Sequence, residues 1–298
     1  MRELSAKSDD PLDTILFRSP VVRIGKFRVW PGNRRFCDSG PIQRHVVVFP
    51  RTLVRITHAG KDSFIAGPDL VTYYNREQIY RRESVHNLPD RCEWFAFGPE
   101  VLRDALRELD PAASDRRDAP FAFSRGPSDP ESYLRQRRVV EALAAEQSPD
   151  PMDVEEEMVG VLGRILKAAY RRPGGESAGQ KAVLVRRFDR DLAEEAKQIM
   201  GRSFRRRLPL DEIATDLGVS IYRLCRTFRK ETGTTLHRFR NRLRFAAALE
   251  QLSRRSGDLT GIALDLGFSS HSHFTAAFRR EFGLTPSTIL RDRRPARS

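Results

Sequence analysis

Four side chains near position 225 have the types and the spacing needed to contact DNA bases. They follow one another at i, i+3, i+4 and i+7, so a helix would place them along one face. They are Tyr222, Cys225, Arg226 and Arg229. An arginine on such a face can donate to O6 and N7 of guanine, and a tyrosine can contact a thymine methyl group or a phosphate. The set predicts recognition of base edges in a major groove.

A second set further along the chain has the same spacing and a different chemistry. It consists of His271, Ser272, Thr275 and Ala276. His271 could donate to a base acceptor, and Thr275 could contact a thymine methyl group or a phosphate. Ala276, like Cys225, has little hydrogen-bonding power, so that position would be read by shape or apolar contact. We therefore expect the two sets to recognise different bases.

Each set lies on the second helix of a two-helix pattern that occurs twice, at about 210–231 and about 259–281. An Ile-Ala pair and a leucine three residues later give each first helix one apolar face. A glycine then allows a turn, a serine can cap the second helix, and another glycine ends it. These residues are Gly218, Ser220 and Gly233 in the first copy, and Gly267, Ser269 or Ser270, and Gly283 in the second. The pattern predicts two helix-turn-helix motifs.

One face of each second helix is expected to pack. The packing residues would be Ile221, Leu224 and Phe228 in the first copy and Phe274, Ala277 and Phe278 in the second. A helix predicted over 236–252 would span about 25 Å and could set the reading helices roughly one turn of DNA apart. The hypothesis is a bipartite, non-palindromic site in successive major grooves. The candidates for contact with DNA phosphates are Arg205, His237, Arg238, Arg279 and Arg280. Each of these arginines could equally be an ordinary solvent-exposed side chain.

The positive charge of the chain is concentrated at the two motifs. Residues 181–298 carry 25 Lys and Arg against 13 Asp and Glu, whereas residues 1–180 carry 28 against 27. A basic region beside a neutral one is typical of phosphate binding, with an affinity that falls as salt rises. A non-specific nucleic-acid binder would also explain the charge, but it would not explain the duplicated pattern.

The duplicated segment resembles the DNA-binding domain of AraC/XylS-type transcription regulators. The second copy carries the strongest signature: Ile262, Ala263, Gly267, Phe268, Ser270, Phe274, Phe278, Arg279, Gly283, Thr285 and Pro286. One departure follows Pro286, where the family usually has an aromatic residue and then an arginine, and this chain has Ile289 and Leu290. The resemblance implies that the two reading sets face bases. It also implies a non-enzymatic activator that binds double-stranded promoter DNA and has RNA polymerase as a partner.

Short apolar segments between turn residues dominate the region from about 16 to 97. Their spacing predicts a small antiparallel barrel or sandwich. The resemblance implies a cupin-like β-barrel that binds an effector or dimerises. The expected fold class is therefore α+β multidomain, with this barrel and its helices followed by an all-α domain. A barrel can enclose one small ligand, and the candidate pocket residues are aromatic, although aromatic residues on strands more often belong to the core. They are Tyr73, Tyr74, Trp94 and Phe97.

A cupin-type enzyme, or a small-molecule-binding protein with an accessory DNA-binding domain, is the alternative function. Metal-dependent cupins need closely spaced histidines and a carboxylate, whereas His45, His58 and His86 stand far apart. We therefore expect no metal, no catalytic residue and no cofactor. Cys37 and Cys92 are expected to be small buried hydrophobic residues. No signal peptide or membrane span is predicted, which favours a cytoplasmic protein.

Helices are expected beyond the strands. One starts near 99, and two amphipathic helices at about 132–146 and 152–171 would either form a dimer seam or only cover the barrel. A stretch rich in glycine, 172–180, reads as a flexible linker. The expected domains are thus 1–171 for effector binding or dimerisation and 181–298 for DNA binding, which opens with a helix at about 183–203.

Overall fold

The chain forms two compact units, Met1–Arg172 and Pro173–Ser298. The computed structural model describes residues 13–33, 36–86, 88–116, 118–145, 149–171, 180–254 and 258–292. Most of the expected linker, 172–179, lies outside the described residues. No helix in the part that is described has the length and apolarity needed to cross a membrane.

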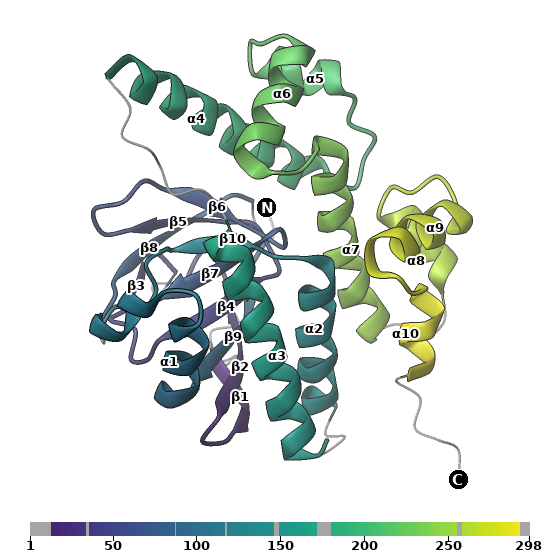
Figure 1. The fold of residues 1–298 in the computed structure, drawn as a ribbon. Coiled ribbons are helices and arrows are strands. Elements are labelled where there is room, and N and C mark those ends of the chain that lie inside the picture. Colours follow the sequence, from purple (N-terminus) through teal and green to yellow (C-terminus); the bar gives the residue numbers. More distant parts are fainter. Residues whose placement is uncertain are drawn as a thin grey trace. The chain divides into compact units, whose positions relative to one another are not determined.

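Unit 1 is built on two antiparallel sheets (Figure 1). The larger sheet has the order β1-β2-β9-β4-β7-β10, and the smaller has the order β3-β8-β5-β6. The strands of the larger sheet are β1 (Asp13–Arg18), β2 (Val22–Val29), β4 (Val46–Pro50), β7 (Leu70–Tyr74), β9 (Asp90–Phe97) and β10 (Arg125–Pro127). Those of the smaller sheet are β3 (Asp38–Ser39), β5 (Val54–His58), β6 (Phe64–Ala66) and β8 (Tyr80–Ser84).

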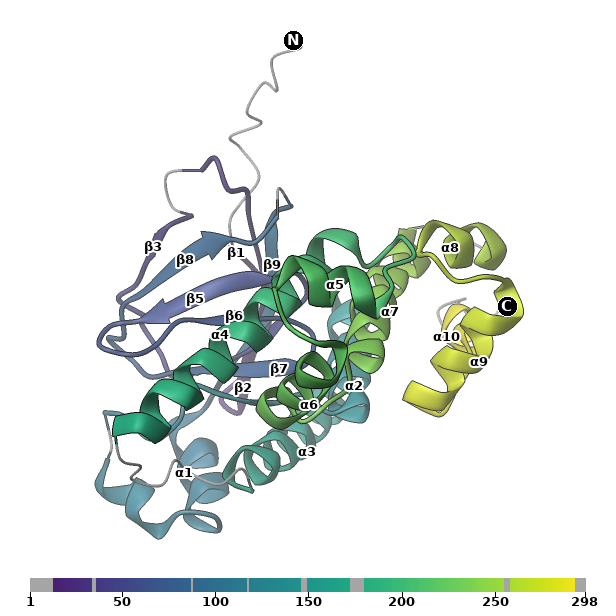
Figure 2. The same ribbon diagram turned by 90° about the horizontal axis from the view of Figure 1, so that it is seen from above.

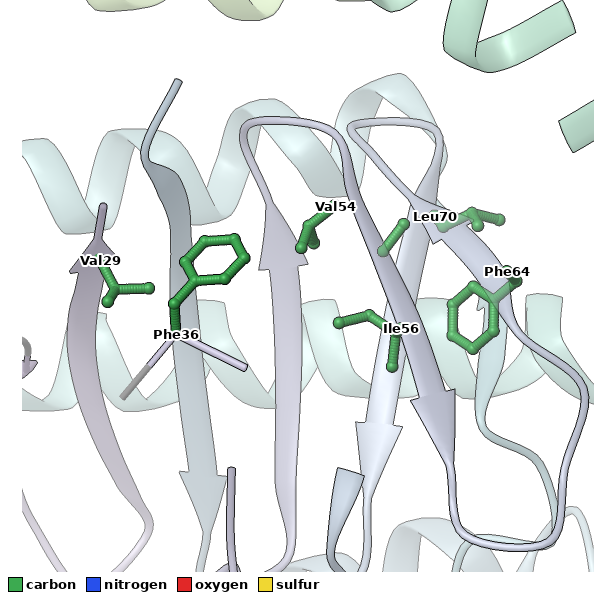
Figure 3. Close-up of a cluster of buried hydrophobic side chains, with 7 residues drawn as sticks. Val29, Phe36, Val54, Ile56, Phe64 and Leu70 are labelled. Atoms are coloured by element: carbon green, nitrogen blue, oxygen red, sulfur yellow. The ribbon is translucent and has the colours of Figure 1, made fainter. Parts of the chain in front are cut away.

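The two sheets share an apolar core (Figure 3). Every second residue of a strand points to the same side, so each strand contributes alternate residues to this core. Val29 and Leu70 from the larger sheet belong to one cluster of buried side chains with Val54, Ile56 and Phe64 from the smaller one. Both sheets remain open at their edges, so unit 1 has the sandwich form of the predicted antiparallel fold.

The opposite face of the larger sheet packs against two helices, α2 (Pro130–Ala144) and α3 (Pro151–Tyr170). The hydroxyl of Tyr73 in β7 donates to the carbonyl oxygen of Ile165 in α3 at 3.1 Å. Glu93 in β9 accepts from Arg137 in α2 at 2.7 Å, and both side chains are buried. These contacts show that both helices cover the sheet. Unit 1 also contains α1 (Pro99–Arg107) and a 3-10 helix, η1 (Pro111–Asp115).

Unit 2 is all helical (Figure 2). Its helices are α4 (Gln180–Ser203), α5 (Leu210–Asp216), α6 (Ile221–Thr232), α7 (Leu236–Arg254), α8 (Leu259–Asp265), α9 (His271–Phe282) and α10 (Pro286–Asp292). The pairs α5-α6 and α8-α9 are the two predicted helix-turn-helix motifs, and α7 runs between them (Figures 1 and 2). The predicted fold class, antiparallel β followed by all α, is confirmed.

Candidate nucleic-acid interface

Helix α6 has one packed side and one free side. Its N-terminus is capped by Ser220, whose Oγ accepts from the N–H of Arg223 at 3.2 Å. Its C-terminus ends at Gly233, which has the left-handed φ of 74° that glycine adopts cheaply. Leu224 and Phe228 are buried, whereas Tyr222 is 74% exposed. The free side is therefore available to a groove of DNA.

Helix α9 repeats this construction. Of the two serines expected as its cap, Ser270 fills the role, because its Oγ accepts from the N–H of His273 at 3.1 Å. The helix ends at Gly283 with φ 76°. From the second residue onward, the pattern of buried and exposed residues in α9 is the same as in α6. The sequence repeat is thus also a repeat of local structure.

The eight predicted base-reading residues lie on the free sides of these helices or at their margins. Those that are exposed are Tyr222, Arg226, Arg229, Ser272 and Ala276, and those that are half-buried are Cys225, His271 and Thr275. The half-buried pair in α9 is in mutual contact, with 3.4 Å between Thr275 Oγ1 and His271 Nε2. That contact restricts the rotamers of both side chains before any base arrives.

Ile221 departs from the prediction that it packs. It is 45% exposed, and Thr227 takes the buried position instead. Ile221 is the first residue of α6, and its side chain stays open to solvent at that end of the helix. The packed stripe begins at Leu224.

A hollow of about 570 Å³ borders the free side of α6. Its lining combines the four reading residues of α6 with residues of α4, of α5 and the segment before it, and of α7 and the turn before it. It consists of Met200, Leu208, Pro209, Leu210, Ile213, Tyr222, Cys225, Arg226, Arg229, Thr235, Leu236, His237 and Arg240. Because most of this lining is apolar and it includes three arginines, Arg226, Arg229 and Arg240, the hollow can accept the edge of a base or sugar beside a phosphate. The spacing pattern within α6 does not reveal that His237 shares this surface.

The pKa of His237 reflects the charges that surround it. Burial lowers the pKa of His237, and the positive charges of Arg240, Arg280, Arg244 and His273 lower it further. These groups belong to α7 and α9, so positive charge from the second motif reaches the hollow beside the first. At neutral pH the imidazole is therefore neutral and can donate one N–H to an acceptor.

The other phosphate candidates differ in how free they are. Arg205, Arg279 and Arg280 are exposed, and the guanidinium of Arg205 lies 5.5 Å from the ring centre of Phe204. Arg238 is exposed too, but its Nε donates to Glu281 at 3.2 Å. A phosphate at Arg238 would compete with that carboxylate.

Unit 1 contains a second candidate site, a cavity of about 630 Å³. It opens on the side of the larger sheet that faces the smaller one, and both sheets line it. Among the residues predicted for a pocket, Tyr74 and Trp94 line the cavity. Their neighbours on the opposite face do not: Tyr73 points to α3, and Phe97 is buried away from the cavity. Alternation along each strand separates the four, so the ligand-pocket hypothesis narrows to Tyr74 and Trp94.

A polar cluster forms one wall of this cavity. Arg82, which is 4% exposed, donates to Asp90 at 3.3 Å, to the hydroxyl of Tyr80 at 2.8 Å and to Ser39 Oγ at 2.6 Å. Burial raises the pKa of Asp90, and the charge of Arg82 opposes this rise. A ligand that reaches this wall would meet hydrogen-bonding groups already fixed in place. This cluster was not predicted from the sequence, although charged residues such as Arg82 and Asp90 within strands indicate buried polar contacts.

The histidines of unit 1 do not form a cluster. His58 is buried and stacks on the ring of Phe64, with 6.0 Å between the ring centres, and the rings of Tyr74 and Tyr80 lie tilted against it at 5.1 and 6.1 Å. Across the described ranges, no three His, Cys, Asp or Glu side chains lie close enough to hold a metal ion. Cys92 lies in the cavity wall, whereas Cys37 is exposed and not buried as predicted. The short β3 strand that follows Cys37 lies at the edge of its sheet, where a side chain has little cover.

Comparison with known proteins agrees with the geometry of unit 2. A family model described as a helix-turn-helix domain matches residues 213–292. The transcriptional activator RhaS of Escherichia coli O139:H28 is 37% identical over 83 residues, which are 28% of this chain and 30% of RhaS. The chain thus matches less than a third of the length of this relative.

The chain is also similar to two solved structures. An AraC-type regulator from Chromobacterium violaceum is 30% identical, with a TM-score of 0.33 over 37% of this chain and 99% of that one. ToxT of Vibrio cholerae is 10% identical, with a TM-score of 0.35 over 91% of this chain and 98% of that one. The sequence matches, not these superpositions, define the class: unit 2 is a helix-turn-helix DNA-binding domain. More particularly, its sequence is similar to that of the activator RhaS over 83 residues, which supports the predicted resemblance to AraC/XylS-type regulators.

Proposed function

We propose that the chain is a sequence-specific transcription regulator that places α6 and α9 in successive major grooves of promoter DNA. The observation that carries the proposal is the structural repeat. Two helices with the same caps and the same buried stripe each present a free side, and the surrounding unit is strongly basic. A recognition helix needs this combination of a packed face and a free face beside cationic groups.

The proposal extends to regulation by a small molecule. The cavity of unit 1, at about 630 Å³, lies within the size range of small-molecule sites and combines aromatic walls with a buried polar cluster. RhaS is described as an activator, and we extend that role to this chain, with RNA polymerase as the partner. A homodimer through α2 or α3 belongs to the proposal, although both helices already bury one face against the sheet.

Selection of binding sequences from random DNA tests the first part. The full chain is incubated with random duplexes at physiological salt, and bound sequences are recovered over several rounds. We expect two short blocks about one helical turn apart, with a large affinity ratio over unselected DNA. If binding is sequence-blind and depends on salt alone, the chain is a non-specific nucleic-acid binder and the proposal is wrong.

Tryptophan emission tests the second part. The chain has two tryptophans, and only Trp94 lines the cavity. In a Trp30→Phe variant, a ligand that enters the cavity should change the emission of Trp94 and the affinity for the selected DNA together. A ligand that changes emission while DNA affinity stays constant would favour a binding protein without this regulation.

A further inference from the structure

Arg244 of α7 is buried at the place where the two motifs meet. Its side chain is 4% exposed. Its Nε donates to the carbonyl oxygen of Phe204 at 2.7 Å, and its Nη2 donates to that of Arg206 at 3.3 Å. Both carbonyls belong to the segment that leads into the first motif. The guanidinium also lies 5.1 Å from the ring centre of Phe268, in the turn of the second motif.

Gly267 brings the second motif against the same segment. Its φ of 78° is one that other residues adopt only at a cost. A Cβ at Gly267 would overlap the carbonyl oxygen of Arg205 and would lie 2.8 Å from Nη2 of Arg244. The turn of the second motif therefore presses directly on the backbone that precedes the first, and the guanidinium fills the remaining space.

Other contacts of α7 attach to one motif at a time. Arg240 donates to the carbonyl oxygen of Leu208 at 3.0 Å, on the side of the first motif. Arg242 donates to Glu281 of α9 at 3.0 Å, on the side of the second. Arg244 differs from these neighbours because one planar group contacts both sides at once. A guanidinium can do this because it donates in fixed directions from its edge while its face stacks on a ring.

From this geometry we propose that Arg244 is a positioning residue that fixes the orientation of α9 relative to α6. Through that orientation it sets the number of base pairs between the two blocks that the protein reads. The inference rests on the proposed function, because a spacing exists only if both helices bind DNA. The guanidinium is held by carbonyl oxygens and a ring, so its burial is costly unless the geometry is specific.

The experiment measures affinity as a function of block spacing. The two blocks selected by the wild-type chain are moved apart or together one base pair at a time, and binding is measured for each duplex. The variants are Arg244→Met, which keeps the apolar stem, and Arg244→Lys, which keeps the charge without the planar fork. Phe239→Leu is the matched control, because it loosens the core of the first motif without touching the junction.

We expect the wild-type chain to prefer one spacing steeply. Arg244→Met should weaken binding at that spacing about tenfold, which is the effect of losing one charged hydrogen-bonding group. Binding at other spacings should change far less, so that the preference flattens. Arg244→Lys should flatten it as well, and it keeps the test decisive if Arg244→Met does not fold. Phe239→Leu should weaken every spacing by one common factor.

Two outcomes would overturn the inference, and they are distinguishable. If the Arg244 variants lose affinity uniformly, as expected for Phe239→Leu, Arg244 only stabilises the domain and the proposed function stands. If the wild-type chain selects no pair of blocks, the proposed function fails together with the inference.

Discussion

Helices α6 and α9 are two versions of one scaffold that carry different reading surfaces. Their buried positions match, with Leu224 and Phe228 in α6 standing where α9 has Phe274 and Phe278. Most of their free positions do not match, although Arg229 in α6 corresponds to Arg279 in α9. Arg226 corresponds to an alanine, Ala276, in α9. Because close packing restricts buried side chains, the buried positions remain apolar in both helices, whereas the exposed positions can vary. At this position the difference predicts a first motif that reads by a charged hydrogen bond and a second that reads by shape.

The two motifs also differ in what surrounds the matching stripe. In the first, Phe228 meets the ring of Phe239 at 5.6 Å, and α4 braces the helix through Asp189 and Lys230, which are 2.8 Å apart. In the second, Phe245 is the centre of an aromatic cluster, 5.4 Å from Phe278. The first motif thus depends on a helix outside its own repeat, whereas the second has the denser aromatic core.

The largest expected effect comes from emptying the two cores. Phe228→Ala and Phe278→Ala should each cost about 3–5 kcal/mol of unfolding free energy, because each removes a fully buried ring. Denaturant titration of both variants measures this. Each should lose recognition of its own DNA block more than that of the other. Equal loss of both blocks in both variants would show that the motifs do not fold as separate pieces.

How much of this could be predicted from sequence differs between the units. The helix-turn-helix motifs follow from local signals, since capping serines, glycines with positive φ and apolar stripes act within a few residues. The junction at Arg244 depends on carbonyl groups from a distant segment, so no spacing rule predicts it. In unit 1, alternation shows that Tyr73 and Tyr74 face opposite ways, but only packing decides which face holds the cavity. Strands β2 and β8 are obscured in the sequence by charges, such as Arg82, that pairing allows to be buried.

Arg226→Ala tests the charged reading of the first motif. We expect a loss of about 1–3 kcal/mol confined to one base position of the first block, because an arginine paired with guanine contributes specificity there. Binding to duplexes mutated at single positions measures it. Arg223→Ala is the matched control: it removes the same charge from the same helix, but Arg223 lies over the ring of Phe188 in α4, 4.7 Å from its centre. If Arg226→Ala weakens random DNA equally, Arg226 contacts a phosphate.

Ala276→Arg is the reciprocal test, and its expected effect is smaller. The substitution gives α9 the residue that α6 has at the matching position, so the second block should acquire a preference for guanine of about 1 kcal/mol. Repeating the selection from random DNA measures it. Ala276→Met separates length from charge and should not create the preference. If the second block is unchanged, residue 276 of α9 does not face a base in the complex.

The smallest expected effect is a pH dependence that arises where the two motifs share a surface. The pKa of His237 is lowered by burial and by Arg240, Arg280, Arg244 and His273, so the free protein holds a neutral imidazole at neutral pH.

A DNA phosphate beside His237 would raise that pKa, and binding would then take up a proton. By linkage, affinity should increase as the pH falls through the usual histidine range of about 6.5, by at most about tenfold per pH unit for one proton. Titration of DNA affinity against pH should show a weaker slope for His237→Gln than for the wild-type chain. If the slopes are equal, His237 takes up no proton on binding and contacts no phosphate.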